Sequence, residues 1–141
     1  MRQPTLLIVD DEESVLLTLQ AILERAGYVI TTAANAKEGL SVLSESAGFD
    51  GVITDMSMEH HQSGLEVARA ATRLEPRPVI IIYTGYCDLE STKLALGTAD
   101  YFAMKPFDVQ EFKTVLARLL ALRNDRLPAN NSMYARRQGW L

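Results

Sequence analysis

A short apolar run that ends on an acid is the feature of this sequence that most restricts its fold. In the stretch FDGVITDMSM, Val52, Ile53 and Thr54 are followed directly by Asp55. A short run of apolar and β-branched residues bounded by turn formers is typical of a strand buried on both faces of a parallel sheet. A carboxylate at the carboxyl end of such a strand lies where open α/β sheets place their ligands. We therefore expect Asp55 to belong to a functional site.

Runs of the same kind alternate with segments of helical period along the chain. Besides the run before Asp55, the predicted strands are Thr5–Val9, Tyr28–Ala33, Val79–Tyr83 and Tyr101–Met104. Apolar residues at intervals of three and four predict helices over Val15–Ala26, Ala36–Leu43, Gly64–Leu74, Asp88–Gly97 and Val109–Leu122. Asn35 and Asp108 are expected to cap two of these helices. The alternation predicts a doubly wound α/β fold of the flavodoxin-like kind, with helices on both faces of a parallel sheet. The strand order 2-1-3-4-5 fits, because it makes the polar second strand an edge.

The composition is that of a single domain with a real core. The chain has 141 residues, of which 48% are hydrophobic. Residues 1–123 carry the pattern, whereas residues 124–141 lose it and are expected to form a mobile or docking tail. A net charge of −4 without a long run of one sign argues against direct nucleic-acid binding. Cys87 is the single cysteine, which favours a reducing compartment, and no run approaches the roughly 20 apolar residues of a membrane span. We therefore expect a cytoplasmic protein without membrane contact.

Polar side chains follow four of the five predicted strands. Asp10 and Asp11 follow the first strand, Asp55 the third, Thr84 the fourth and Lys105 the fifth. In the order 2-1-3-4-5 these strands are neighbours, so the side chains should converge at one edge of the sheet. Crowded carboxylates need protons or a cation to neutralise them, and an oxygen-only ligand set favours Mg²⁺. A lysine and a hydroxyl facing that cation suit phosphate, so the predicted chemistry is phosphoryl transfer to a carboxylate.

The motifs LLIVDDEES, VITDMSM, IIYTG and YFAMKPF, in this order, resemble those of the receiver domains of two-component response regulators. The resemblance covers about residues 5–123. It implies a phosphoacceptor signalling module in which Asp55 takes a phosphoryl group from the phosphohistidine of a histidine kinase or phosphotransfer protein. It also implies a downstream protein target, a possible homodimer through the last strand and last two helices, and no enzymatic activity beyond self-phosphorylation and slow self-dephosphorylation.

The resemblance implies a role for each residue that matches the motifs of the metal and phosphate site. Asp11 and Asp55 would bind Mg²⁺ directly, together with the backbone carbonyl of Ser57. Asp10 would act on the cation largely through water, and Lys105 would pair with the phosphoryl group. Ser57 would also tune the rate of dephosphorylation.

Further roles concern the change of conformation that follows phosphorylation. Thr84 would move to bond a phosphoryl oxygen, and Phe102 would turn inward with it. Tyr101 is the alternative switch residue, but alternation along the strand from Lys105 favours Phe102. The Lys105-Pro106 peptide bond would be cis. Tyr86, the second residue after Thr84, would shield the phosphoryl group from water and slow its hydrolysis.

The loop after Asp55 departs from the pattern of the family that the motifs resemble. Members usually have proline four residues after the acceptor and glycine at the eighth position, whereas this chain has Glu59 and then Gly64 at the ninth. The loop is therefore one residue longer. It carries His60 and His61, which we interpret as part of a solvated loop.

Three other classes of protein are alternatives to a phosphorylated receiver. An aspartate-nucleophile phosphohydrolase usually has its nucleophile after the first strand in a D-x-D pattern, which is not present here. A flavin-binding electron carrier of the flavodoxin kind needs Ser, Thr and Gly donors after that strand, where this chain has DDEES. An unphosphorylated scaffold receiver would not need the acid pair, Thr84 and Lys105.

Overall fold

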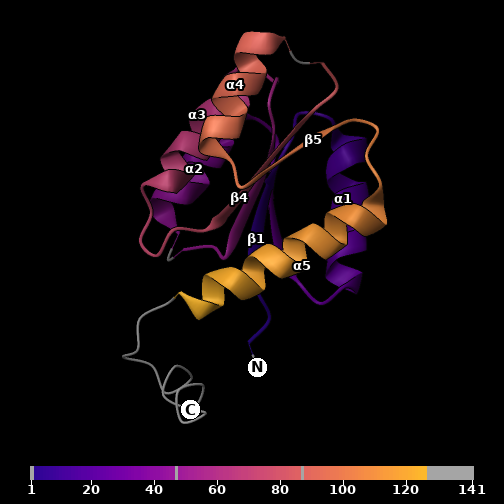
Figure 1. Cartoon of the computed structure of the whole chain (residues 1–141), viewed down its shortest axis with the longest axis vertical. Helices are drawn as coiled ribbons and strands as arrows, with labels where there is room; N and C mark the ends of the chain where they lie inside the picture. Colours follow the sequence, from indigo (N-terminus) through magenta and orange to yellow (C-terminus); the bar gives the residue numbers. More distant parts are fainter. Residues whose placement is uncertain (1, 47, 87, 127–141) are drawn as a thin grey trace.

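Five parallel strands form the centre of the protein. The structure is a computed structural model, which describes residues 2–46, 48–86 and 88–126. The strands are β1 (Thr5–Val9), β2 (Val29–Ala33), β3 (Gly51–Asp55), β4 (Val79–Thr84) and β5 (Tyr101–Met104). The helices are α1 (Glu13–Arg25), α2 (Ala36–Glu45), α3 (Ser63–Thr72), α4 (Leu89–Thr98) and α5 (Val109–Asp125). The strand order is β2-β1-β3-β4-β5, and α1 and α5 lie on one side of the sheet with α2, α3 and α4 on the other (Figure 1). The fold class and the strand order predicted from the sequence are confirmed.

The sheet separates two apolar clusters, because side chains alternate between its faces along each strand. Leu7, Val52 and Ile80 pack with α2, α3 and α4, whereas Ile53 and Ile81 pack with α1 and α5. Every residue of β3 and β4 is buried, as expected for strands covered on both faces. In β2 exposed and partly buried positions alternate up to the buried Ala33, and the strand lies at the edge of the sheet, so the prediction that it forms an edge is also confirmed.

Several element boundaries differ from those predicted. Strand β2 begins at Val29 instead of residue 28, α1 begins two residues before the predicted start, and α3 ends at Thr72. Helix α4 begins at Leu89 because Asp88 is its cap, accepting a hydrogen bond from the Ser91 amide. The caps predicted at residues 35 and 108 are present, each accepting from the amide three residues later.

Helix α5 buries Phe112 and Leu116 as its apolar pattern predicts, but near its carboxyl end the buried positions differ from that pattern, which places Leu122 in the core. Leu120 and Arg123 are buried, whereas Leu122 is 43% exposed. The guanidinium of Arg123 lies 2.9 Å from the carboxylate of Asp50, directly before β3, and this contact holds position 123 inward. The helix continues to Asp125, so the predicted domain boundary at residue 123 falls inside it. The tail predicted for residues 124–141 lies, from residue 127 on, outside the described residues, as does the cysteine at position 87.

A buried carboxylate between two arginines ties the amino edge of the sheet together. Asp50 accepts hydrogen bonds from Arg2 at 2.7 and 3.0 Å, from Arg123 at 2.9 Å and from the amide of Thr5 at 2.8 Å. Burial disfavours its charged form, but the hydrogen bonds from Arg2 and Thr5 and the two guanidinium charges outweigh burial and lower the pKa of Asp50 to about 2. The ion pair between Asp50 and Arg123 joins the start of β3 to the end of α5.

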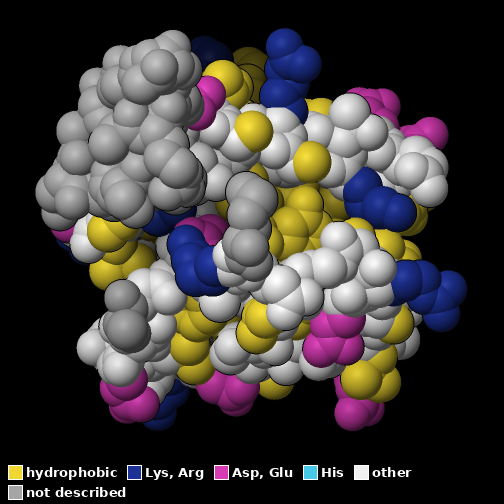
Figure 2. All heavy atoms as spheres, turned by 90° about the horizontal axis from the view of Figure 1, so that it is seen from below, with side chains coloured by type: hydrophobic (Ala, Val, Ile, Leu, Met, Phe, Trp, Pro, Cys, Tyr) yellow, Lys and Arg dark blue, Asp and Glu magenta, His cyan; other side chains and the backbone are white. Residues whose placement is uncertain are grey.

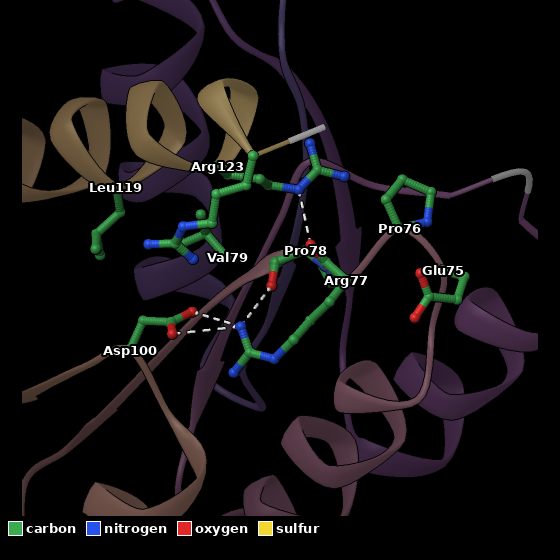
Figure 3. A pocket seen from close by; sticks show the side chains of 9 residues that line it. Glu75, Pro76, Arg77, Pro78, Val79, Asp100, Leu119 and Arg123 are labelled. Carbon is green, nitrogen blue, oxygen red and sulfur yellow. Dashed lines mark hydrogen bonds and ion pairs between the residues drawn. The ribbon is translucent and has the colours of Figure 1, made fainter. Parts of the chain in front are cut away.

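A pocket of about 290 Å³ opens beside this ion pair (Figure 3). Arg77 lies across the pocket, with its Nη1 atom 3.0 Å from a carboxylate oxygen of Asp100. The backbone carbonyl of Arg77 accepts a hydrogen bond from Nε of Arg123 at 2.8 Å. Figure 2 views this end of the molecule from below and shows basic side chains scattered among acidic and apolar ones. Within the described part of the chain, no helix combines the length and the apolar character that crossing a membrane requires.

Candidate functional site

The carboxyl ends of four neighbouring strands bring the strand-end polar residues together. Thr54 pairs with Val9 across β3 and β1, so Asp55 lies beside the residues that follow β1. Asp55 itself pairs with Tyr83 of β4, and Thr84 pairs with the last residue of β5, directly before Lys105. The residues expected to converge therefore lie at adjacent positions of one sheet edge.

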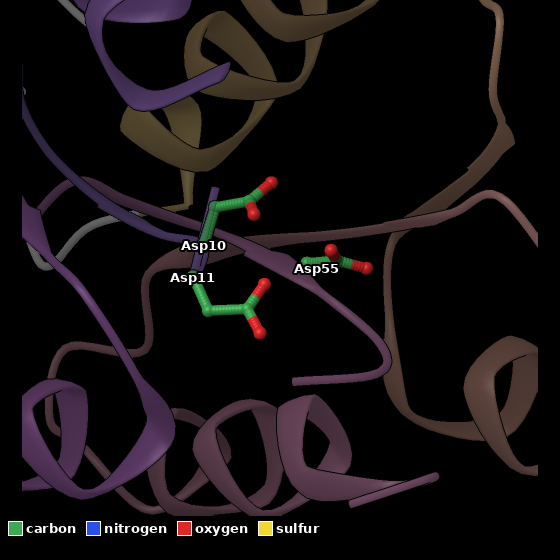
Figure 4. A group of neighbouring side chains, drawn as sticks. All are labelled: Asp10, Asp11 and Asp55. Atoms are coloured by element: carbon green, nitrogen blue, oxygen red, sulfur yellow. The ribbon is translucent and has the colours of Figure 1, made fainter. Parts of the chain in front are cut away.

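Three carboxylates of this edge lie close enough to share a cation. Asp10, Asp11 and Asp55 each offer one oxygen, and these oxygens lie within 4.8 Å of one another (Figure 4). Asp10 is fully buried, Asp55 is 5% exposed and Asp11 is exposed. Burial, and then the charge of Asp10, raise the pKa of Asp55 to about 6, against the opposing effect of Lys105. A set of hard oxygen donors with unbalanced negative charge fits Mg²⁺.

The ammonium group of Lys105 lies between carboxylates of the site. Its Nζ atom lies 3.5 Å from Oδ2 of Asp55, 3.8 Å from Oδ2 of Asp10 and 3.4 Å from Oε1 of Glu12. Desolvation alone would lower the pKa of Lys105, but the charges of Asp55 and Asp10 outweigh it and raise that pKa. The Lys105-Pro106 peptide bond is cis, and so is the bond between Glu75 and the proline after it, for which the sequence carries no prediction.

The Asp10 carboxylate is fixed by two donors of the protein itself. Its Oδ1 atom accepts from the amide of Glu12 at 2.8 Å, and its Oδ2 atom accepts from the hydroxyl of Tyr83 at 2.5 Å. Sequence reasoning predicted Tyr83 only as the end of a buried strand. The available signal was that a buried tyrosine hydroxyl usually needs a hydrogen-bond partner.

The residues expected to respond to phosphorylation lie on β4, β5 and the loop after β4. Thr84 is buried, and its hydroxyl donates to the carbonyl of Tyr86 at 2.7 Å. Tyr86 itself is 69% exposed. Phe102 is partly buried against the cluster on the α2, α3 and α4 side, whereas Tyr101 packs on the opposite face and donates to Glu111 at 3.2 Å. The two aromatic residues therefore face opposite sides of the sheet.

The loop after β3 is bonded to both of its neighbouring helices. Glu59 accepts hydrogen bonds from the first two amides of α2, at 3.0 and 3.1 Å. His61 lies 2.9 Å from the carboxylate of Asp88, the cap of α4, and its carbonyl accepts from the hydroxyl of Ser57 at 2.7 Å. His60 lies 3.2 Å from Glu66. The two histidines are about half exposed but have partners, so interpreting the loop as merely solvated was incomplete.

Gly64 packs directly on the backbone of the candidate acceptor. Its amide donates to the carbonyl of Met56 at 2.7 Å, and a Cβ at this position would lie 1.7 Å from the carbonyl oxygen of Asp55. The loop after β3 thus returns to the backbone of Asp55 and Met56 at a position that only a glycine can occupy.

A buried acid pair with an opposing lysine and threonine, at the carboxyl edge of a sheet ordered 2-1-3-4-5, defines a phosphoacceptor module of the CheY-like class. The chain belongs to the response regulator receiver domain family, whose model matches residues 6–117. Sporulation initiation phosphotransferase F of Bacillus subtilis is 28% identical over 127 residues, which make up 89% of this chain and 100% of that protein. The uncharacterized transcriptional regulatory protein YkoG of the same organism is 35% identical over 123 residues, 86% of this chain. The chain spans about half the length of YkoG, 51%.

Solved structures agree with this assignment. A CheY-like receiver domain from Methanospirillum hungatei has a TM-score of 0.83 and 29% identity, and covers 89% of this chain and 100% of its own. The response regulator TrrA of Thermotoga maritima, solved in complex with Mg²⁺ and BeF, has a TM-score of 0.72 and 32% identity, with 83% of this chain and 99% of its own covered. The protein is thus a receiver domain of the two-component systems, which work between histidine kinases and downstream targets. It is a signalling module, which sets aside the phosphohydrolase and flavin-carrier alternatives.

Proposed function

We propose that Asp55 is the residue that accepts the phosphoryl group from a kinase or phosphotransfer phosphohistidine. The observation that carries the proposal is the Nζ atom of Lys105 at 3.5 Å from Oδ2 of Asp55, at an edge where two more acids lie within reach of one cation. Of the two buried acids, Asp10 is held by short hydrogen bonds to both oxygens, at 2.8 and 2.5 Å. Asp55, at the end of the central strand β3, has only longer contacts, with the Ser57 amide at 3.3 Å and with Lys105 at 3.5 Å. Asp55 is therefore the better placed nucleophile.

Asp11, Asp55 and the carbonyl of Ser57 would hold Mg²⁺, with Asp10 acting through water. The cation neutralises charge between the carboxylate and the incoming phosphoryl group. In the transfer, an oxygen of Asp55 forms a bond to phosphorus while the bond from phosphorus to the imidazole nitrogen breaks, and the imidazole leaves with the donor. Lys105, held between the acids, pairs with the phosphoryl oxygens. Ser57, two residues after the acceptor, would tune the rate of dephosphorylation.

The added phosphoryl group, which carries about −1.5 to −2 charge at pH 7, would favour a conformation that is minor without it. To bond a phosphoryl oxygen, the hydroxyl of Thr84 has to leave the carbonyl of Tyr86, so the loop after β4 changes with it. Phe102 is only partly buried and can move further into the space that this change opens, whereas Tyr101 faces the other side. We propose that this relay reaches a downstream protein target.

An apolar groove beside the site suits the phosphohistidine donor. The groove has a volume of about 580 Å³ and lies between α1 and the start of α5; it is lined by Ser14, Val15, Thr18, Leu19, Ile22, Lys105, Pro106, Phe107 and Val109. Because Lys105 lines both the groove and the acid cluster, a helical donor seated there would carry its imidazole to Asp55. We propose a histidine kinase or phosphotransfer protein as the occupant.

Other partners follow from the exposed apolar side chains of the last elements. Leu96, Met104 and Leu122 of α4, β5 and α5 are each more than 40% exposed, which supports a homodimer through this face. With its net charge of −4 the chain is proposed to work without direct contact to nucleic acid. We place it in the cytoplasm, as its single cysteine suggests.

The mass of the intact chain after incubation with Mg²⁺ and a small phosphodonor tests the acceptor assignment. The wild-type chain should gain the mass of one phosphoryl group, and Asp55→Asn should gain none. Asp100→Asn, which changes a carboxylate at the opposite edge of the sheet, is the matched control and should gain as much as the wild type. No gain in the wild type would support an unphosphorylated scaffold, and an equal gain in Asp55→Asn would move the acceptor to another residue.

A further inference from the structure

We propose that Tyr83 is a positioning residue of the phosphoacceptor site, which fixes the Asp10 carboxylate with its hydroxyl and supports the Lys105 ammonium with its ring. The inference rests on the function proposed for this site. It goes beyond the residues to which the resemblance gives a role, because Tyr83 lies within the motif IIYTG but is fully buried in β4 and has no role assigned there.

Tyr83 lies next to the site, beside Asp55 on the neighbouring strand β4. Its Cα pairs with those of Asp55 on β3 and Ala103 on β5, and its side chain is fully buried on the α1 and α5 side. The hydroxyl donates to Oδ2 of Asp10 at 2.5 Å while the amide of Glu12 donates to Oδ1 at 2.8 Å. A fully buried carboxylate is stable only with such donors, so this pair sets how Asp10 faces the other acids.

The ring of Tyr83 carries the second contact. The Nζ atom of Lys105 lies 5.1 Å from the ring centroid, within the range of a cation–π interaction. The ring in turn packs against Phe107 at 5.6 Å between centroids, and Phe107 stacks on Phe112 of α5 at 5.2 Å. The ring of Tyr83 is thus packed against an aromatic cluster of the core, which keeps its hydroxyl directed at Asp10.

Removing the hydroxyl of Tyr83 should change the positions of Asp10 and Lys105 relative to each other. The Asp10 carboxylate already lies 3.8 Å from Nζ of Lys105, and without the tyrosine donor it would turn toward that ammonium. This movement would draw Lys105 from Asp55 and turn Asp10 away from the cation. Burial and then the charge of Asp10 raise the pKa of Tyr83 far above its usual value, so the hydroxyl remains a donor throughout the working range of pH.

Calorimetric titration with Mg²⁺ alone, at about pH 8 where Asp55 is ionised, tests the hydroxyl. Tyr83→Phe should bind Mg²⁺ about tenfold more weakly than the wild type, because it misplaces Asp10, which would hold the cation through water, and outer-shell groups of metal sites typically affect affinity by this factor or more. Tyr28→Phe removes a hydroxyl from a partly buried tyrosine outside the site and should bind as the wild type does. At saturating Mg²⁺, Tyr83→Phe should regain most of the phosphorylation rate, whereas Tyr83→Leu, which also lacks the ring below Lys105, should not.

A double-mutant cycle with Asp10→Ala separates positioning from a general effect on packing. If the hydroxyl acts through Asp10, adding Tyr83→Phe to Asp10→Ala should change the Mg²⁺ affinity by less than about twofold. A full tenfold loss in that background, or a wild-type Mg²⁺ affinity of Tyr83→Phe alone, would overturn the inference. A wild-type chain that neither binds Mg²⁺ nor gains phosphate would instead overturn the proposed function, so the two failures are distinguishable.

Discussion

Replacing Asp55 by asparagine should stabilise the metal-free protein at alkaline pH and leave its stability nearly unchanged in acid. The fold raises the pKa of Asp55 from the usual 3.8 to about 6, first by burial and then by the charge of Asp10. The folded state therefore binds this proton more tightly than the unfolded chain does. As pH rises through 4 to 6, the free energy of unfolding should fall by about 3 kcal/mol from this group alone. Asparagine carries no such charge, although Lys105 loses a partner, so we expect a net gain of about 2 to 3 kcal/mol at pH 8.

Urea unfolding followed by circular dichroism, in the presence of a chelator, measures this difference. The gap in unfolding free energy between Asp55→Asn and the wild type should be widest at about pH 8 and should close below about pH 4. The Asp50 ion pair also weakens in acid, but it is present in both proteins and cancels from the gap. Equal unfolding free energies of the two proteins at pH 8 would refute the argument that ionised Asp55 destabilises the fold. A difference of the same size at pH 8 and at pH 4 would refute it as well. Added Mg²⁺ should stabilise the wild type more than the variant.

Three further predictions concern other parts of the chain. Gly64→Ala should abolish phosphoryl uptake and lower the free energy of unfolding by more than about 2 kcal/mol, measured with urea, because the added Cβ would lie 1.7 Å from the carbonyl oxygen of Asp55. As a control, Gly97→Ala in α4, where an added Cβ has nothing within 4 Å, should raise the free energy of unfolding by about 0.5 to 1 kcal/mol. Tyr86→Ala should shorten the lifetime of the acyl phosphate, followed as loss of the added mass with time, and an unchanged lifetime would count against shielding by that side chain. Asp50→Asn should lower the free energy of unfolding by about 3 to 5 kcal/mol, since it leaves a buried guanidinium without its carboxylate; a loss below about 1 kcal/mol would contradict this.

The sheet and the convergence of its strand-end residues could be predicted from the sequence because both depend on local patterns. Apolar runs such as Val79–Tyr83 indicate buried parallel strands, and their alternation with helices leaves few topologies. Once the order 2-1-3-4-5 is adopted, Asp10, Asp55 and Lys105 have to meet at one edge. The same local information placed the caps of α2 and α5.

Contacts that depend on the packing of distant segments could not be predicted. The hydroxyl of Tyr83 and the carboxylate of Asp10 are separated by 73 residues, as are Asp50 and Arg123. An apolar periodicity counts tyrosine as a core residue and arginine as a surface residue, so it says nothing about either pairing. For the same reason the pattern placed Leu122 in the core, where the structure has the arginine one position later.

The contact of Glu59 with the first amides of α2 makes that helix a reporter of the acceptor loop. The amide protons of Ala36 and Lys37 point at a carboxylate that belongs to the loop after β3, and His61 of the same loop meets the cap of α4. In a nuclear magnetic resonance spectrum, these two amide signals would register any shift of the loop without a probe in the site itself. The transfer of a phosphoryl group to Asp55 would then be visible at the starts of two separate helices, α2 and α4.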